Sequence, residues 1–559
     1  MSQSTYRPAQ GSLFDPILNL TGRQFKKLDE GWAGHFYREI FPLLIELEEL
    51  FAPLYSPLPN SRPSTPTHYI LGLLVLKSLF SLTDEEVEER MNFSIDFQYA
   101  LGTTSFVHQP VNQRSLNRFR AANALYEQKT GTDLLKNFSE KLADRLKEVW
   151  IGPKRKRRMD SVMIDNSCRH LSRLQLAHVV TKNALFLLQE HQIDIPEELH
   201  HYIEDFDENN VTYHSTLPAK EKLEVAFRDA CAARALIPSE LQDQEEALLL
   251  NRFIDEQIIL SDDGSFETVR DGKTLTSTTL NNPADPESTI RTKAGETHIG
   301  YVGNMAETVD EETGHKIIDS MDLQPNIYSD SQFARDEIAK MAEAGDTSTL
   351  VTDGAYSSVD NVNLAAKNGI ELIGTAMTGK ETPDLVAEFT IDEETETVTC
   401  PAGKEADKAT HCEKDDSWNV SFMKDSKCAD CPFAANGQCP LKNRKHVRSG
   451  RISQKMIQRA QLQRKTQTAE FGENYRFRNG VEAIPSQLRR MQNIDHLPFR
   501  GLVRKKQGFV LAITAINVRR VLRYAKEGAK NGLDFCFQNL LTVIFVKTGT
   551  NSQSEGILV

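Results

Sequence analysis

The chain has 559 residues, of which 39% are hydrophobic and 26% charged, and its formal net charge at pH 7 is −13. These totals describe a soluble, folded protein too long for one ordinary core. No run approaches the roughly 20 apolar residues that span a bilayer, no secretion signal is recognisable, and eight cysteines in so long a chain make no disulfide scaffold. We expect a cytoplasmic protein with no membrane partner.

Residues 1–150 predict helices, because apolar residues recur at three- and four-residue spacing in residues 36–54 and 67–101. Thr83 or Ser81 is the expected N-cap of a helix that begins with several acids. Further along, one candidate helix carries three arginines that could follow a phosphate backbone or form a salt-bridged face: Arg114, Arg118 and Arg120. The sequence therefore predicts an all-α N-terminal domain.

From Met159 the pattern changes to short strands. Residues 158–164 predict a first strand, and a mostly helical insertion at 166–296 follows it. Strands and helices then alternate: strands at 296–310 and 315–326, a helix at 329–345, a strand at 347–353, a helix at 357–369 and a strand at 370–377. This order predicts an α/β fold with a largely parallel region, in which ligands collect at the carboxyl ends of strands. Asp353 lies at such an end.

A cysteine cluster marks residues 381–450, after a strand-like stretch at 384–400. Cys428 and Cys431 form a Cys-x2-Cys pair, and Cys400 and Cys439 are the chosen partners, with Cys412 or His411 in reserve. Two thiolates at this spacing can occupy adjacent corners of a zinc tetrahedron. The pattern predicts a zinc-ribbon-like insertion with structural Zn²⁺; reduced cysteines without metal are the alternative.

The last part of the chain, residues 451–559, predicts helices, the last of them apolar at 535–546. Residues 440–530 contain 22 Lys and Arg against five Asp and Glu, so this block carries +17 and the rest about −30. A second basic cluster, Lys154–Arg158, precedes the motif MDSVMID. Such segregation predicts a surface that faces a polyanion, although a solvated charged face gives the same pattern.

Three acids from distant elements form a hypothetical metal site: Asp160, Asp353 and Glu482. Two-metal phosphoryl transfer requires hard oxygen ligands that hold ions roughly 3.5–4 Å apart. Asp165 competes with Asp160, and the two point to opposite faces of a strand, so only one can be the ligand. No P-loop pattern is present, so nucleotide hydrolysis is not expected.

The spacing Tyr475-x2-Arg478-x3-Glu482-x6-Arg489 resembles the Tyr-Arg-Glu-Lys signature of DDE-type bacterial insertion-sequence transposases, with Arg in the Lys position. Other segments appear in the order found in that superfamily: MDSVMI, GYVGN, VTDGAYSS, FRNGVEAIPSQLRR and LAITAINVRR. The resemblance covers about residues 60–530. It favours Asp160 over Asp165, because MDSVMI is the matching part. Gly480 and Pro485 depart from a continuous helix through Glu482, and a break there would re-aim Arg489.

The resemblance implies a ribonuclease-H-like catalytic core that cuts and joins DNA ends. Asp160, Asp353 and Glu482 would hold two Mg²⁺ or Mn²⁺ ions, and four residues would contact DNA: Tyr475, Arg478, Arg489 and Arg490. The partners would be the double-stranded terminal inverted repeats and the target DNA, bound by a homodimer in the bacterial nucleoid. A catalytically inactive DNA-binding derivative and a nuclease that only hydrolyses are the alternatives.

With this resemblance, the expected domain organisation has six parts. They are a helical, DNA-end-binding domain at 1–150, the first core strand at 151–165, a helical insertion at 166–296, core strands and helices at 297–380, the cysteine insertion at 381–450 and basic core helices at 451–559.

Overall fold

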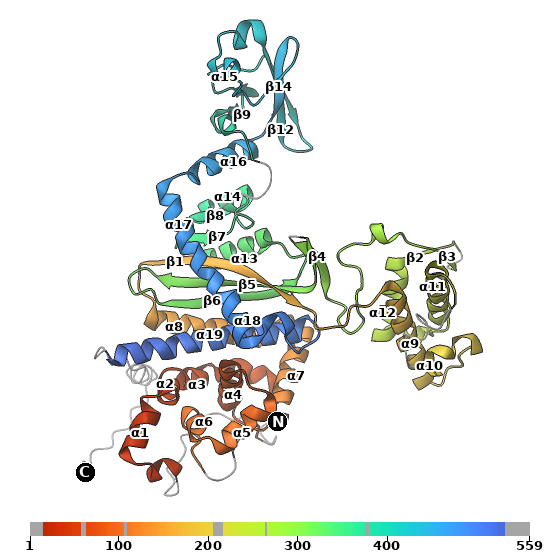
Figure 1. The fold of residues 1–559 in the computed structure, drawn as a ribbon, viewed down its shortest axis with the longest axis vertical. Coiled ribbons are helices and arrows are strands. Elements are labelled where there is room, and N and C mark those ends of the chain that lie inside the picture. Colours follow the sequence, from red (N-terminus) through yellow and green to blue (C-terminus); the bar gives the residue numbers. More distant parts are fainter. Residues whose placement is uncertain are drawn as a thin grey trace.

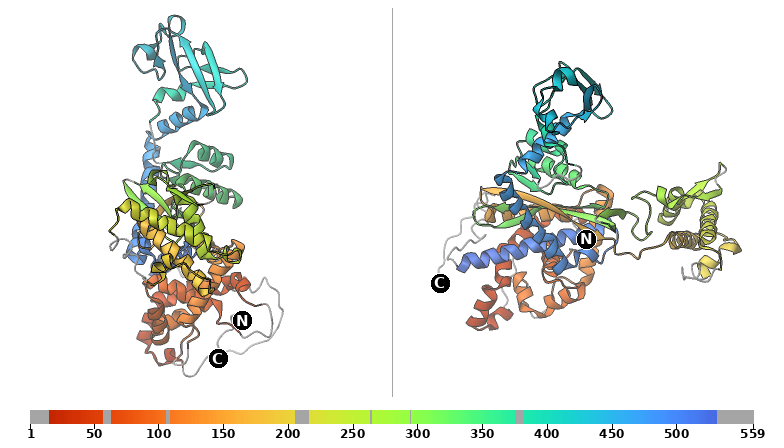
Figure 2. Two further views of the ribbon diagram at one scale, coloured as in Figure 1. Left: turned by 90° about the vertical axis from the view of Figure 1, so that its right-hand side faces the viewer. Right: turned by 45° about the horizontal axis from the view of Figure 1, so that its top comes forward.

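The structure is a computed structural model that describes residues 15–56, 63–105, 109–204, 216–262, 265–293, 295–374 and 381–530. A central sheet has helices on both faces, and two further units, a helical arm and a small β-rich module, project from it in different directions (Figures 1 and 2). None of the described helices is long and apolar enough to cross a membrane. The apolar helix predicted at 535–546 lies outside the described residues.

The central sheet has six strands and mixed directions. Its members are β1 (Arg155–Asp165), β4 (Thr289–Lys293), β5 (Glu296–Asp310), β6 (Lys316–Pro325), β7 (Leu350–Thr352) and β8 (Leu372–Gly374). β5 pairs antiparallel with β1, β4 and β6, whereas β1 pairs parallel with β7 and β7 parallel with β8. The predicted order of strands and helices is therefore present, with one additional strand, β4, and the parallel region lies at β1, β7 and β8.

Both faces of the sheet are covered by helices. α13 (Asp330–Glu343) and α14 (Val359–Lys367) pack on one face in a core that includes Met159, Val302 and Tyr356. α8 (Leu134–Trp150) and α19 (Leu502–Lys530) cover the other face and share a large core with the N-terminal helices (Figure 1). Ser329 caps the start of α13 through a capping box with Gln332.

The N-terminal region is helical, as its periodicity predicts. Its α-helices are α1 (Gly22–Asp29), α2 (Trp32–Glu39), α3 (Phe41–Leu47), α4 (Thr67–Phe80), α5 (Asp84–Phe93), α6 (Ile95–Ala100) and α7 (Gln113–Thr130). Of the two N-cap candidates, Thr83 caps α5 through a capping box with Glu86, while Ser81 ends α4 in a left-handed conformation.

The insertion after β1 forms the arm, which has a core of its own. It contains α9 (Arg173–Glu190), α10 (His201–Glu204), α11 (Ala219–Ala235), α12 (Glu245–Gln257), β2 (Ile258–Leu260) and β3 (Phe266–Val269). Its two ends meet at the sheet, where the Asn166 amide donates a hydrogen bond to Ser288 Oγ at 3.3 Å.

The cysteine-bearing module is a separate small β-unit with its own core. It contains β9 (Thr390–Asp392), β10 (Thr397–Thr399), β11 (Lys408–Cys412), β12 (Ser417–Met423), α15 (Pro432–Ala435), β13 (Lys442–Asn443) and β14 (Val447–Ile452). The prediction of one strand at 384–400 is wrong. The stretch instead forms a 3₁₀ turn at Asp384–Glu388 and then the β9–β10 hairpin. The chain reverses between the two strands because the Asp392 carboxylate accepts hydrogen bonds from the backbone N–H groups of Glu394 and Thr395.

The chain returns from this module to the sheet through α16 (Gln454–Lys465), α17 (Ala469–Asn479), a 3₁₀ turn at Gly480–Glu482 and α18 (Ala483–Gln492). The expected break near Glu482 is present, but it occurs at Gly480. Pro485 lies in the first turn of α18, where a proline costs no helical hydrogen bond. A turn at Ile494–His496 then leads into α19.

The basic cluster before MDSVMID does not form a polyanion-facing surface as a whole. Arg157 and Arg158 lie within β1 and are buried. Arg157 pairs with Asp319 at 2.9 Å and also with Glu337, while Arg158 pairs with Glu307. The prediction is wrong for these two arginines, since buried cations require buried acidic partners rather than solvent or DNA.

Candidate active site

Two predicted acids lie side by side at the edge between β1 and β7. Arg157 is level with Leu350 and Arg158 with Val351 in this parallel pair. The same offset places Asp160 level with Asp353, which directly follows β7. Neighbouring strands are about 4.8 Å apart, so the register brings the two carboxylates together.

Asp160 lies in a partly desolvated position, with a side chain 16% exposed. Its Oδ1 accepts the Ser161 N–H at 2.9 Å, and its Oδ2 is 3.5 Å from Arg478 Nη2. Burial raises the pKa of Asp160 and the nearby Asp353 raises it further, against the opposing effects of Ser161 and Arg478. An additional cation beside these two carboxylates would favour their ionised form.

Glu482 is connected to this pair through one arginine. Arg478 Nη1 lies 2.5 Å from Glu482 Oε1, so its guanidinium stands between Asp160 and Glu482. The Glu482 side chain is 60% exposed. Among the residues that the structure describes, no group of three or more His, Cys, Asp or Glu is placed to hold a metal ion. In this arrangement Glu482 is held by Arg478 and does not join the two aspartates in a ligand group.

Arg158 fixes the segment that carries Arg478 and Glu482. Its Nη1 donates to the Phe477 carbonyl at 2.5 Å, and its guanidinium lies over the Phe477 ring, 4.9 Å from the centroid. Its Nε donates to Glu307 at 2.7 Å, and Arg520 of α19 pairs with the same carboxylate at 2.9 Å. A Cβ on Gly480 would lie 2.0 Å from Arg158 Nη1, so the guanidinium would have to shift to admit any larger residue here.

A fourth acid, which sequence reasoning missed, lies in the same neighbourhood. Asp330 is buried at the start of α13, accepts a hydrogen bond from Ser161 Oγ at 3.1 Å, and lies 3.5 Å from Arg291. Burial raises the pKa of Tyr356 well above its ordinary value, and Asp330, Asp160 and Asp353 add to this effect. Asp330 follows the N-cap Ser329, where an acid is ordinary, so nothing in the local pattern distinguished it.

The residues proposed to contact DNA are spread along α17 and α18. Arg489 turns away from the acids and pairs with Asp495 at 3.0 Å, whereas Arg490 lines a separate cavity. The Tyr475 side chain lies outside the described residues. Asp165 is the alternative ligand, and its Oδ2 lies 3.5 Å from His496 Nδ1. Arg478 and Asp353 lie beside Asp160 instead.

The four chosen cysteines line one small cavity in the β-rich module: Cys400, Cys428, Cys431 and Cys439. Burial raises the pKa of the Cys428 thiol, and the other three thiols raise it further. The reserve candidates Cys412 and His411 lie on β11, where His411 pairs with Asp416 at 3.0 Å. Thiolates are the ligands that zinc prefers. In the described part of the chain, however, these four thiols are not placed close enough together to hold a metal ion.

Two family models match the chain. The family described as "Transposase DDE domain" matches residues 399–522, and "Transposase domain (DUF772)" matches residues 26–122. Both matches support an insertion-sequence transposase. The first transposase match contains Arg478, Glu482 and the four cysteines, while Asp160 and Asp353 lie outside both. Comparisons with curated proteins and with solved structures gave no match.

Proposed function

We propose that this chain is a transposase that cuts and joins the ends of an insertion sequence by metal-dependent phosphoryl transfer at Asp160, Asp353 and Glu482. The observation that carries the proposal is the register of β1 and β7, which sets Asp160 beside Asp353, together with the Arg478 contacts that connect Asp160 to Glu482. The two transposase matches support the same class of activity.

The roles of the side chains follow from their charges. Asp160 and Asp353 would bind divalent ions, and Glu482 would join them after leaving Arg478. Bound Mg²⁺ or Mn²⁺ would supply Lewis acidity for attack on a phosphodiester. Arg478, whose side chain is 13% exposed, can exchange a carboxylate for a DNA phosphate through charge-assisted hydrogen bonds.

The fold and the assembly belong to the same proposal. The antiparallel strands β1, β4, β5 and β6, followed by an alternation of helices and parallel strands, support a ribonuclease-H-like core with two insertions. The N-terminal helices and the basic C-terminal helices would bind the DNA ends. An insertion sequence has two ends, so two copies of the chain would act together on DNA.

The decisive experiment replaces Asp353 by Asn. We expect Asp353→Asn to abolish Mg²⁺-dependent cleavage of DNA that carries the element's ends, while DNA binding is retained. The matched control is Asp360→Asn on α14, whose exposed carboxylate pairs with Lys455. Cleavage by Asp353→Asn at the wild-type rate would refute the proposed site. If the wild-type protein cleaves DNA but does not join strands, the chain is a nuclease and not a transposase.

We also propose that the four cysteines hold one structural Zn²⁺. Their thiolates are the ligands that zinc prefers, and the small core of the module would gain stability from such a cross-link. Metal analysis of the purified chain is expected to give one zinc per chain, and Cys428→Ser with Cys431→Ser is expected to give none. Absence of zinc from the wild-type protein would exclude this part of the proposal.

A further inference from the structure

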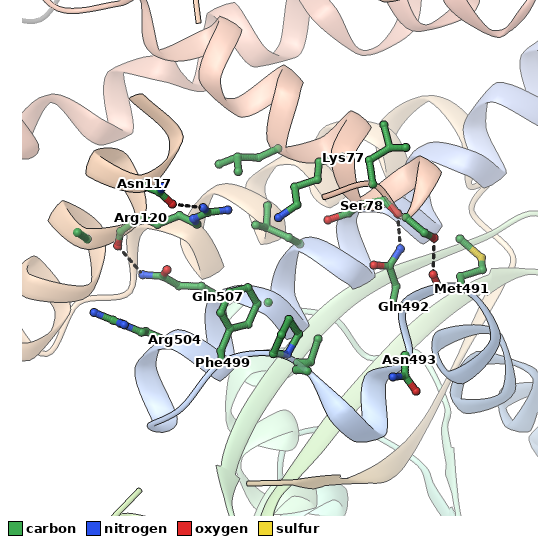
Figure 3. A pocket seen from close by; sticks show the side chains of 18 of the residues that line it. Lys77, Ser78, Asn117, Arg120, Met491, Gln492, Asn493, Phe499, Arg504 and Gln507 are labelled. Atoms are coloured by element: carbon green, nitrogen blue, oxygen red, sulfur yellow. Dashed lines mark hydrogen bonds between the residues drawn. The ribbon is translucent and has the colours of Figure 1, made fainter. Parts of the chain in front are cut away.

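A cavity lies at the C-terminal end of α18, away from Glu482 at its N-terminal end. It is a cavity of about 620 Å³ between α4 and α7 of the N-terminal region and the segment that joins α18 to α19 (Figure 3). This volume is within the range of about 300–1,000 Å³ for small-molecule sites. Neither the acids of the candidate active site nor the four cysteines line it.

The charge of this cavity is positive. Its lining includes Lys77, Arg120, Arg490 and Arg504 and contains no Asp or Glu. Lys77 and Arg120 are both held by Asp84, the former at 2.7 Å. Arg490 and Arg504 are exposed and form no ion pair with any residue in the described part of the chain. Arg490 also lowers the pKa of the neighbouring Arg519, after the larger effect of burial. Two cations therefore remain available for an anionic ligand.

One wall of the cavity is an aromatic platform. Phe499 packs against Gly508 of α19, where a Cβ would come within 2.9 Å of the ring. The glycine therefore allows the Phe499 ring to lie directly on the helix. Figure 3 shows Phe499 between Arg504 and Gln507 on one side and Gln492 on the other. Leu497, Pro498 and Leu511 extend the apolar surface around the ring.

The opposite wall is held in place by contacts between distant segments. Ser81 Oγ donates to the Met491 carbonyl, and the Gln492 amide donates to the Ser78 carbonyl (Figure 3). Gln507 donates to the Arg120 carbonyl at 3.2 Å. These bonds join α4 to α18 and α7 to α19, so the cavity is formed before any ligand binds.

An aromatic platform beside free guanidinium groups suits a flat base attached to a phosphate. In a duplex the bases are stacked inside the helix, and a protein contacts mainly the phosphates. A paired base therefore could not stack on the aromatic wall of this cavity, whereas an unpaired base could. We propose that this cavity binds one unpaired nucleotide of the DNA, with its base on Phe499 and its phosphate at Arg504 and Arg490. This inference rests on the proposed DNA transposase function and adds a second DNA-binding site to it.

The position of the cavity relative to the acids fits one continuous strand. α18 runs from Ala483, next to Glu482, to Gln492 at the cavity, and its ten residues span about 15 Å. Stacked nucleotides are about 3.4 Å apart along a strand, so about four nucleotides cover this length. The unpaired nucleotide would lie at that distance from the cleaved bond.

The test uses the full chain and two DNA probes, a blunt duplex and the same duplex with a four-nucleotide single-stranded end whose last base is 2-aminopurine. For wild type we expect tighter binding of the tailed duplex and a change in 2-aminopurine fluorescence on binding. For Phe499→Ala and Arg504→Gln we expect roughly tenfold weaker binding of the tailed duplex, the size of one lost stacking or phosphate contact, with blunt-duplex binding unchanged. The matched control is Arg335→Gln, an exposed arginine on α13, outside the helices proposed to bind DNA.

The outcomes separate the two proposals. If Phe499→Ala and Arg504→Gln bind both probes as the wild type does, the cavity does not bind a nucleotide, whatever the enzyme cleaves. If both variants lose affinity for blunt and tailed DNA equally, the cavity contacts the duplex and the unpaired nucleotide is refuted. If the wild type binds neither probe, the proposed function fails first. Loss confined to the tailed probe supports the inference.

Discussion

Glu39 shows what one buried side chain does to the N-terminal helices. It ends α2 with 3% of its surface exposed, and its Oε2 has no hydrogen-bond partner among the described residues. Burial raises the pKa of Glu39 to about 7, against a smaller opposing effect of Arg38. Between pH 4.5 and about 7 the folded protein therefore keeps this carboxyl neutral, whereas an unfolded glutamate is ionised.

The sign of the resulting pH dependence follows from this raised pKa. Below pH 4.5 the carboxyl is neutral in both states and costs nothing, and the penalty grows between pH 4.5 and 7 and stays constant above that. We expect Glu39→Gln to raise the free energy of unfolding by roughly 2–3 kcal/mol at pH 8 and to leave it unchanged near pH 4. Thermal unfolding at both pH values measures the effect.

The control for this prediction is Glu30→Gln, which changes an exposed acid nine residues earlier in the chain. A Glu39→Gln variant with the same gain at pH 4 and pH 8 would show that side-chain packing, and not ionisation, limits stability there.

At the residue scale, the sequence placed some site residues and missed others for a physical reason. Asp353 was predicted because a strand ending in an acid is visible locally, and its position beside Asp160 follows from a parallel strand pair. Arg158 and Asp330 were missed because their contacts, with Phe477 and Ser161, join segments 319 and 169 residues apart. No local pattern records such a contact.

The junction between α17 and α18 sets the position of Arg478 and Glu482. Gly480 lies against the Arg158 guanidinium, and a methyl group there would have to displace it. We expect Gly480→Ala to slow cleavage at least tenfold while DNA binding changes little, because the turn that carries Glu482 would shift away from Asp160. Cleavage and binding measured on the same DNA test this.

Gly472 offers a matched control in the same helix. A Cβ at Gly472 meets nothing within 4 Å, so Gly472→Ala is expected to cleave as the wild type does. Equal cleavage rates for Gly480→Ala and Gly472→Ala would show that the Arg158 contact does not position the acids.

At the element scale, prediction succeeded where the signal is local. The bounds of β5 were predicted as 296–310, and Thr83 was one of the two expected caps of α5. It failed at 384–400, where a turn at Asp392 interrupts a β-rich composition. It also failed at Arg157 and Arg158, where buried acids from β5, β6 and α13 neutralise apparently exposed cations. The β-propensity of a residue does not indicate whether its side chain will be on the buried or the exposed face of a sheet.

For the whole molecule, the distribution of free cations matters more than the net charge of −13. Arg464 of the basic block is occupied by Asp384 and Glu388, whereas Arg114 and Arg118 on α7 are exposed and form no ion pair within the described residues. DNA affinity is therefore expected to fall steeply with salt, since each phosphate contact releases a counterion.

A double variant makes this expectation quantitative. Arg114→Gln with Arg118→Gln is expected to reduce the slope of log affinity against log salt by about 2, which corresponds to two lost phosphate contacts. Arg464→Gln, the paired control, is expected to leave the slope unchanged. A slope equal to that of the wild type in the double variant would remove α7 from the DNA interface.

The roots of the arm have a consequence for how such a chain can change over time. Asp165 is level with Gly300, and Gly300 with Thr289, so the two roots lie on strands that flank β5. The Asn166–Ser288 hydrogen bond already holds them together. Residues 168–284 could therefore be replaced by a short linker between the two roots, or by a foreign domain, without moving the strand that presents Asp160. The replacement would keep Ser167, Asp285 and Glu287, which bond to the central part of the chain.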